Sequence, residues 1–446
     1  MMRAPFGGAS LELRQTAKAV TPFGGIALFA QFLQKVGWSQ VLSEHMPIEY
    51  RSPNAIPPAH TLTLFMVSVL VGARRFAHSA LLKADEALHA ILGIKRCPGA
   101  DAVRKFFTRF DGGKIQALWR PLWKWMLQRV PPMQGGYTLD LDSSVFERYG
   151  HQQGAQKGYN PSRRGQRSHH PLLAVLSEVH VVLHGWLRAG ATTACSGVVN
   201  FLREALEMAR QAGISIHTLR ADCGFYGQAL LGFLEEQGLG YVVIARQTGR
   251  MERLMRGITQ WQKLANGSEL GEFTAAVGDW KVARRFIVLR REARERRQEG
   301  LLLSLPPRHI YRVLVTNRSE SAAELWRLYE GRARIELCIR ELKDDLHVQG
   351  FCLQNFHGSE SALLAVLCLY NLLSEFQRAT DPGKGQWRTP GRLREEFIVC
   401  GAILGRSARK LVLRFSMAWG GLETRKPLFE RLLHWPEPKS PFLSTA

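Results

Sequence analysis

Between residues 137 and 245 the chain changes repeatedly between the two-residue period of a strand and the longer period of a helix. Tyr137 to Val145 alternates strictly, and an apolar stretch from Leu172 to Leu187 is interrupted at residues 177–178, which predicts a hairpin. A helix (197–212), a strand (214–221), a helix (228–237) and a strand (241–245) are predicted next. This order, β-β-β-α-β-α-β, predicts an α/β fold with a mixed sheet flanked by helices.

The regions on either side have different patterns. Residues 1–132 are predicted to be mainly helical, and Pro131 and Pro132 mark their end. Short strands and a dense basic run, Arg290 to Arg297, indicate a β-rich insertion over 248–318. A long helix is expected from Ala322, and an apolar helix from Ser361 to Phe376. We therefore expect domains at 1–132, 133–247, 248–318, 319–380 and 381–446, with little predicted for the last.

The balance of charges limits the kind of partner. The formal net charge is +22, which for a folded chain favours a polyanion, either nucleic acid or an acidic membrane surface. The most apolar stretch, Thr61 to Gly72, is shorter than the ~20 residues of a membrane-spanning helix, so no membrane partner is expected. The seven cysteines form no C-x-x-C pair, which fits a reducing cytoplasm.

The predicted helix that begins near Ala322 carries an unusual group of polar residues. Ser321 and Glu324 have the spacing of a capping box, which marks its start. At about 100° per residue, one apolar stripe contains Leu328, Ile335, Ile339, Leu342 and Leu346. A narrow arc beside that stripe contains Tyr329, Arg332, Glu336 and Lys343. Glu341 and Asp344 are expected to point away. A carboxylate at the edge of a buried face indicates a functional site, and a solvated face with ordinary ion pairs is the alternative.

Three aspartates are candidate metal ligands. Asp140 and Asp142 share one face of the strand at 137–145, where two like charges are unfavourable unless a cation lies nearby. Asp222 follows the strand at 214–221, and ligands bind beyond such carboxyl ends in α/β sheets. The alternatives are a polar edge strand for the first pair and a helix cap for Asp222. Hard oxygen ligands on separate elements suit magnesium or manganese.

These motifs resemble those of the DDE transposases of bacterial insertion sequences, and most closely the insertion sequence 1380 group of the insertion sequence 4 superfamily. That superfamily carries Y-x2-R-x3-E-x6-K, and here every spacing is met by Tyr329, Arg332, Glu336 and Lys343. The segments 139–145, 150–172 and 219–227 are similar to the two aspartate motifs and the loop between them. The resemblance covers about residues 135–380.

The resemblance implies a ribonuclease-H-like core with Asp142, Asp222 and Glu336 as catalytic carboxylates that hold two Mg²⁺ or Mn²⁺ ions. The usual threonine near the first aspartate is Ser144 here. The D-x-[ST] spacing favours Asp142, and Asp140 stays an alternative for the first position. The implied reaction is cleavage at the ends of an insertion sequence followed by strand transfer into target DNA. A ribonuclease-H-like nuclease without strand transfer and a non-catalytic DNA-binding descendant are the alternatives.

The resemblance also implies how DNA is held. Arg332, Lys343 and Tyr329 would contact the backbone near the scissile bond. The expected basic contacts farther along the DNA are Arg163, Arg164 and Arg167 in the loop at 148–170 and the run at 281–297. His169 and His170 are interpreted as phosphate contacts or plain loop residues. The helical N-terminal region would read the element ends. The expected partner is double-stranded DNA, bound by a homodimer in the bacterial cytoplasm at the nucleoid.

Overall fold

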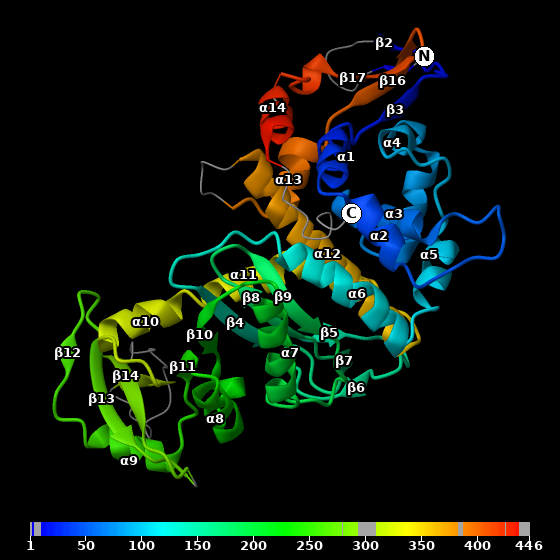
Figure 1. The fold of residues 1–446 in the computed structure, drawn as a ribbon. Helices are drawn as coiled ribbons and strands as arrows, with labels where there is room; N and C mark the ends of the chain where they lie inside the picture. Colours follow the sequence, from blue (N-terminus) through cyan, green and yellow to red (C-terminus); the bar gives the residue numbers. More distant parts are fainter. Residues whose placement is uncertain are drawn as a thin grey trace, which may run out of the picture. The chain divides into compact units, whose positions relative to one another are not determined.

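The computed structural model has a mixed sheet at the position where the sequence predicts one (Figure 1). Its first five strands are β4 (Tyr137–Ser143), β8 (Leu172–Leu176), β9 (Val181–Trp186), β10 (Ile216–Ala221) and β11 (Gly240–Ile244). They adjoin in the order β9-β8-β4-β10-β11. β4, β10 and β11 run parallel, and β8 is antiparallel to both its neighbours. The predicted order is therefore confirmed for the strands of this sheet and the helices between them, whereas the segment expected as a loop near residues 150–170 also contains short strands.

Helices cover both faces of this sheet because the strands alternate in their side chains. Leu139 and Leu141 are fully buried on one face, where α7 (Val198–Gln211) and α8 (Gln228–Glu236) pack. Asp140 and Asp142 project from the opposite face of β4, next to the helices after residue 321. The acidic residues of β4 thus lie between the sheet and a helical layer.

Four further strands extend the same sheet. They are β12 (Gln262–Lys263), β13 (Glu269–Ala275), β14 (Arg284–Glu292) and β15 (His309–Thr316), preceded by α9 (Gly249–Arg256). Because β15 pairs antiparallel with β11, they continue the central sheet to nine strands rather than forming a separate one. Of the basic run at 290–297, only residues 290–292 lie within the described part of the chain.

The single long helix predicted from Ala322 is broken in the structure. It consists of α10 (Ala322–Glu330), α11 (Ala333–Arg340) and a π-helical turn, η3 (Glu341–Asp345). The predicted capping box of Ser321 and Glu324 is present at the start. The predicted outward position of Glu341 is wrong: its side chain is buried and accepts a hydrogen bond of 2.8 Å from the Tyr370 hydroxyl. A π-turn advances fewer degrees per residue than an α-helix, so the helical projection fails beyond residue 340.

The helical layer on the acidic face of the sheet contains two apolar packing groups. α10 packs through Leu325, Trp326 and Tyr329 on strands β11, β13, β14 and β15. α12 (Phe356–Thr380) is the helix among the described residues whose length and composition would allow it to cross a membrane, and 83% of its most apolar window is buried. Its Asn371 side chain exchanges two hydrogen bonds with the backbone of Val182 on the edge strand β9. Burial and edge-capping make α12 a core helix of this fold.

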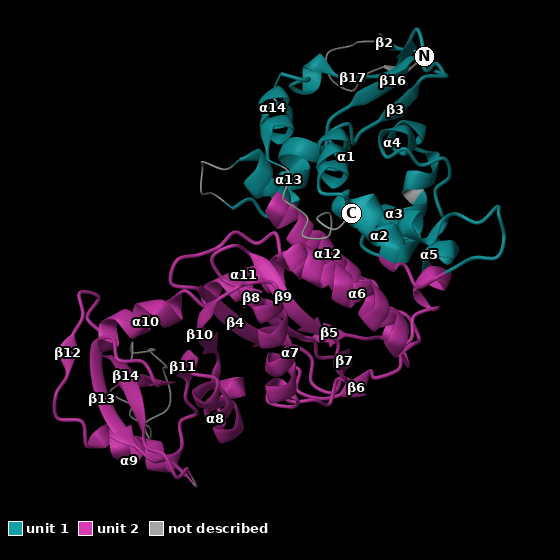
Figure 2. Cartoon of the chain, in the orientation of Figure 1, with its two compact units in different colours: residues 1–44, 49–103, 376–446 teal, residues 45–48, 104–375 magenta. Residues whose placement is uncertain are grey.

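The structure describes residues 2–3, 10–278, 280–292, 309–381, 387–423 and 425–436, and the chain divides into two compact units (Figure 2). The large sheet belongs to the unit of residues 45–48 and 104–375, together with α6 (Gly112–Leu127) and a small sheet of β5 (Phe146–Glu147), β6 (Gln156–Lys157) and β7 (Arg167–His169). The five functional domains expected from the sequence stay a prediction.

The other unit joins both ends of the chain, residues 1–44, 49–103 and 376–446. Its N-terminal helices are α1 (Ile26–Lys35), α2 (Trp38–His45), α3 (Pro58–Leu70), the 3-10 helix η1 (Phe76–Ala84), α4 (Glu86–Ile91) and the start of α5 (Ala100–Phe107). Its C-terminal elements are α13 (Pro390–Leu393), β16 (Ala402–Ser407), β17 (Lys410–Phe415) and α14 (Lys426–His434). β3 (Ala19–Thr21) pairs with β16, so residues almost 400 positions apart form one sheet.

Candidate active site

The carboxyl ends of two neighbouring parallel strands bring Asp142 and Asp222 to the same edge of the sheet. Ala221 of β10 pairs with Leu141 of β4, so the residue after each member of this pair is an aspartate. The Asp142 side chain is 13% exposed, and Asp222 is half-buried. Asp222 also accepts a hydrogen bond of 2.9 Å from the Gly224 amide, which caps the short turn after β10. The two sequence interpretations of Asp222, a cap and a site residue, are thus compatible.

Arg332 joins the helix glutamate to the first of these aspartates. Its Nη2 lies 2.9 Å from Asp142 Oδ2, and its Nη1 lies 2.8 Å from Glu336 Oε1. The Arg332 side chain is 7% exposed, whereas that of Glu336 is 62% exposed. The Glu336 side chain therefore extends from the edge of the buried face into solvent, and the guanidinium holds it toward β4. The sequence placed Glu336 beside the buried stripe but gave no partner for it.

The electrostatic surroundings of Asp142 connect all three carboxylates. Burial raises the pKa of Asp142 to about 6, the Arg332 guanidinium opposes that rise, and the charges of Asp222 and Glu336 add to it. Burial lowers the pKa of Arg332, but the same carboxylates outweigh burial and hold its pKa above the ordinary value. A negative cluster that one buried cation only partly neutralises attracts a further cation.

The other aspartate of β4 is held in a closed ion pair. Asp140 is fully buried, and its two oxygens accept from Arg220 Nε at 2.6 Å and Arg220 Nη2 at 2.8 Å. Arg220 Nη2 also donates to Ser177 Oγ. Arg220 stands opposite Asp140 in the parallel pairing of β10 with β4, so the two side chains share a face. This pairing leaves Asp142 as the aspartate of β4 at the open edge.

Arg220 also explains why the helix breaks between α10 and α11. Its Nη1 donates at 2.6 Å to the Leu328 carbonyl, which in a continuous helix would accept from the Arg332 amide. That amide bonds to the Tyr329 carbonyl instead. Gly331 lets the guanidinium approach, because a methyl group at position 331 would overlap Arg220 Nη1. Sequence reasoning did not single out Arg220, although an arginine two residues before Asp222 in an apolar strand was a signal.

The remaining members of the helix motif lie near this cluster. Tyr329 is 7% exposed within the packing group of α10, and burial raises the pKa of its hydroxyl. Lys343 is half-buried, its Nζ lies 5.8 Å from the centre of the Phe146 ring, and burial lowers its pKa. Tyr329 interacts electrostatically with Glu336, and Lys343 interacts electrostatically with Asp142. The π-turn that carries Lys343 thus still directs its charge toward the site.

The basic loop between β6 and β7 is exposed, as a surface for phosphate would be. Arg163, Arg164 and Arg167 are all exposed, and Arg163 donates to the Tyr149 hydroxyl at 2.7 Å. The interpretation of His169 and His170 as phosphate contacts is wrong, because both are buried and hold backbone carbonyls within the loop. Burial lowers the pKa of His169 to about 4, so it is neutral at physiological pH.

The three carboxylates carry the kind of oxygen donor that a divalent cation requires. Within the described ranges no group of three His, Cys, Asp or Glu side chains lies close enough to hold a metal as it stands. Arg332 occupies the space between Asp142 and Glu336 and keeps them bridged. Three carboxylates on separate elements, one buried and one solvent-facing, still supply the hard oxygen ligands that Mg²⁺ or Mn²⁺ prefers. The donor chemistry of these residues therefore suits such an ion.

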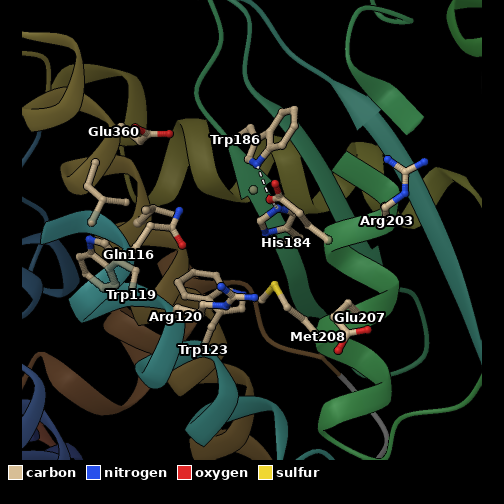
Figure 3. Close-up of a pocket in the computed structure, with 14 residues that line it drawn as sticks. Gln116, Trp119, Arg120, Trp123, His184, Trp186, Arg203, Glu207, Met208 and Glu360 are labelled. Atoms are coloured by element: carbon tan, nitrogen blue, oxygen red, sulfur yellow. Dashed lines mark hydrogen bonds and ion pairs between the residues drawn. The ribbon is translucent and has the colours of Figure 1, made fainter. Parts of the chain in front are cut away.

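A cavity of about 290 Å³ lies elsewhere in the same unit, between α6, α7, β9 and α12 (Figure 3). It is aromatic, lined by Trp119, Trp123, His184 and Trp186 among others. Asp142 is aligned through Leu173 with Gly185, so His184 and Trp186 project from the opposite face of the sheet. The cavity contains none of the three carboxylates and is separate from the candidate site.

Comparisons with known proteins give one family match, which spans most of the chain. The family described as "Transposase DDE domain group 1" matches residues 4–436. None of the curated proteins matches the sequence. Among solved structures, a piggyBac transposase synaptic complex with hairpin DNA is similar over 84% of this chain and 81% of that chain, with 11% identity and a TM-score of 0.45.

Proposed function

Because this chain belongs to the DDE transposase family, we propose that it cuts DNA at the ends of an insertion sequence and joins the released ends to target DNA. Asp142, Asp222 and Glu336 are the proposed catalytic carboxylates. The observation that supports this assignment is their convergence: two lie at the ends of adjacent parallel strands, and Arg332 holds the third toward them. The closed pairing of Asp140 with Arg220 favours Asp142 as the first aspartate.

Divalent cations, Mg²⁺ or Mn²⁺, are the proposed cofactors, two per site. When bound, such ions would stabilise charge on the attacking and leaving oxygens of a phosphodiester during in-line displacement. The three carboxylates would hold them. Water is the nucleophile in the first reaction, which frees a 3′-hydroxyl, and that hydroxyl attacks target DNA in the second.

The cations of the site have distinct proposed tasks. The Nε–H of Arg332 is buried and has no hydrogen-bond partner among the described residues, so a phosphate oxygen that enters the site would satisfy it. Burial of such a donor is costly unless an acceptor arrives, which supports a backbone contact near the scissile bond. Lys343 and Tyr329 would position the same backbone. Arg163, Arg164 and Arg167 would contact phosphates farther along the DNA.

The finer assignment follows the sequence resemblance. The chain would belong to the insertion sequence 1380 group, and the strand order β9-β8-β4-β10-β11 supports a ribonuclease-H-like core. Residues 248–318 would form the insertion domain, and residues 1–132 would bind the element ends. Each protomer would have one such site, whereas the two ends of an element must be joined together, which favours a homodimer on DNA. The proposed location is the bacterial cytoplasm, at the nucleoid, without a membrane partner.

The test is a set of single substitutions in the full chain with a plasmid carrying the element ends. Asp142→Asn, Asp222→Asn and Glu336→Gln should each abolish cleavage in Mg²⁺ but leave DNA binding intact. Asp344→Asn is the matched control, because Asp344 is an exposed acid eight residues farther along the same helical segment. Loss of cleavage with Asp344→Asn and not with Glu336→Gln would contradict the assignment.

Two readouts separate the alternatives. Recovery of joined products with pre-cleaved ends distinguishes a transposase from a nuclease that only cuts. DNA binding by wild-type protein with no cleavage in Mg²⁺ or Mn²⁺ would instead favour a non-catalytic descendant.

A further inference from the structure

The C-terminal part of the chain contains a hairpin that the catalytic assignment leaves without a role. β16 and β17 pair over six residue pairs, from Ala402 with Phe415 to Ser407 with Lys410. β3 pairs only with the base of this hairpin, at residues 402–404. Beyond Leu404 and its partner Leu413 the hairpin therefore has two strands only, and we call the whole hairpin, residues 402–415, the C-terminal ribbon.

The charge of this region is one-sided. From Val399 to Leu422 the sequence contains four cations and no acidic residue. The cations are Arg406, Arg409, Lys410 and Arg414, and all four are exposed. Within the described residues, none of the four forms an ion pair with a carboxylate, unlike Arg14, Arg392 and Lys426 of the same unit. Unpaired exposed cations on one hairpin produce a strong local positive potential.

The pairing register distributes these charges around the ribbon. Lys410 and Arg414 alternate with Leu411 and Leu413, so they share one face of β17. Arg406 pairs with Leu411 and therefore projects from the other face. Arg409 lies in the turn after Ala408, whose φ of 52° forms the tight reversal. Positive charge thus covers both faces and the tip.

This arrangement fits the major groove of duplex DNA. The groove is about 12 Å wide and admits a two-stranded β-ribbon, and exposed cations on such a ribbon lie within reach of the phosphates that border the groove. A second copy of this chain could pair with the free edge of β17, but the repulsion of Lys410 and Arg414 with their own copies opposes that pairing. Leu411 is 54% exposed and could contact a thymine methyl group.

We propose that the C-terminal ribbon is a DNA-binding element that enters the major groove, with Arg406, Arg409, Lys410 and Arg414 on the phosphates. The inference rests on the proposed function, because it takes duplex DNA as the partner of the chain. It goes beyond that function by assigning DNA contact to residues 405–414, outside both the carboxylate site and the N-terminal region.

The experiment measures duplex binding by the full chain over a range of salt concentrations. Replacement of Arg409, Lys410 and Arg414 by glutamine should weaken binding and reduce the log–log salt slope by about 0.9 per lost phosphate contact, or ~2.7 in all. The matched control replaces Arg14, Arg392 and Lys426 by glutamine. It removes the same net charge from cations of the same unit that already have carboxylate partners, and its slope should change by less than ~1.

A gain-of-charge variant guards against misfolding of the glutamine variant. Ser407→Lys adds a cation at an exposed ribbon position and should steepen the slope by about 0.9. Methylation protection of guanine N7 reports on the major groove and should be lost in the triple ribbon variant.

Each outcome separates the ribbon from the proposed function. Wild-type protein that binds no duplex contradicts the proposed function itself. Wild-type protein that binds, with equal slopes for ribbon and control variants, overturns the ribbon inference alone. Unchanged duplex binding with lost binding to vesicles of anionic phospholipid would also overturn it, in favour of a membrane surface.

Discussion

Removal of Arg220 tests whether the buried pair with Asp140 holds together the elements that carry the proposed site. Arg220→Met keeps most of the apolar stem but leaves Asp140, which is fully buried, without its bidentate partner. Breaking a buried pair in this way costs about 3–5 kcal/mol, because a buried charge is left uncompensated. Arg220 also donates to Ser177 and to the Leu328 carbonyl, so the loss should fall in the upper part of that range.

A double-mutant cycle isolates the charge from these other contacts. Asp140→Asn removes the orphaned charge, so the loss of unfolding free energy in Asp140→Asn/Arg220→Met should be smaller than the sum of the two single-variant losses by about 2 kcal/mol or more. Denaturant unfolding of the full chain, followed by tryptophan fluorescence, measures all four corners. Arg210→Met is the control, because Arg210 forms an exposed pair with Glu207 on α7, and it should cost about 0–1 kcal/mol.

The same proteins report on the site itself. Since Arg220 interrupts the helix beside Arg332, Arg220→Met should also slow DNA cleavage while DNA affinity is retained. A single-variant loss below ~1 kcal/mol, or strict additivity in the cycle, would refute the argument that this pair links β4, β10 and α10.

Three further predictions follow from individual contacts. Gly331→Ala should destabilise the fold by about 2 kcal/mol or more, because its methyl group would displace the Arg220 guanidinium. The control is Gly232→Ala on α8, where the space around the glycine is open, and it should be neutral or stabilise by up to ~1 kcal/mol. Equal shifts of the melting temperature in the two variants would contradict this. Burial raises the pKa of Asp142 to about 6, so protons should compete with Mg²⁺ for this carboxylate as the pH falls below 6. The affinity for Mg²⁺, measured by calorimetry, should then decline by up to about tenfold per pH unit. An affinity that does not change between pH 5 and 7 would count against the site. Glu341→Ala should cost about 1–3 kcal/mol, measured by denaturant unfolding, because the Tyr370 hydroxyl loses the buried carboxyl that accepts its hydrogen bond; unchanged stability would instead support the outward position predicted from the sequence.

Periodicity predicted the order of elements between residues 137 and 245, and it did so for a local reason. Alternation in Tyr137 to Val145 sets which side chains share a face of the strand, whatever the rest of the chain does. The parallel neighbours β4 and β10 then bring two aspartates to one edge. The helix motif placed Glu336 at the boundary of a buried stripe by the same local reasoning, although the catalytic role of all three carboxylates stays a proposal.

Tertiary structure decided the features that depend on distant partners. The local spacing favoured Asp142 but left Asp140 as an alternative, because the difference between them lies in Arg220, eighty residues away, which pairs only with Asp140. The same guanidinium takes the carbonyl of Leu328 and breaks a helix whose sequence is helical throughout.

The C-terminal sheet shows the same limit. Residues 19–21 and 402–404 are short segments without a strong period of their own. They become strands by pairing with each other, and residues 402–404 also pair with residues 413–415. A single strand satisfies none of its backbone hydrogen bonds internally, so its existence depends on a partner that the sequence does not specify locally. Neighbouring residues determine which side chains share a face of a helix or strand, whereas the partner of a buried charge or of an edge strand is determined only when the chain has folded.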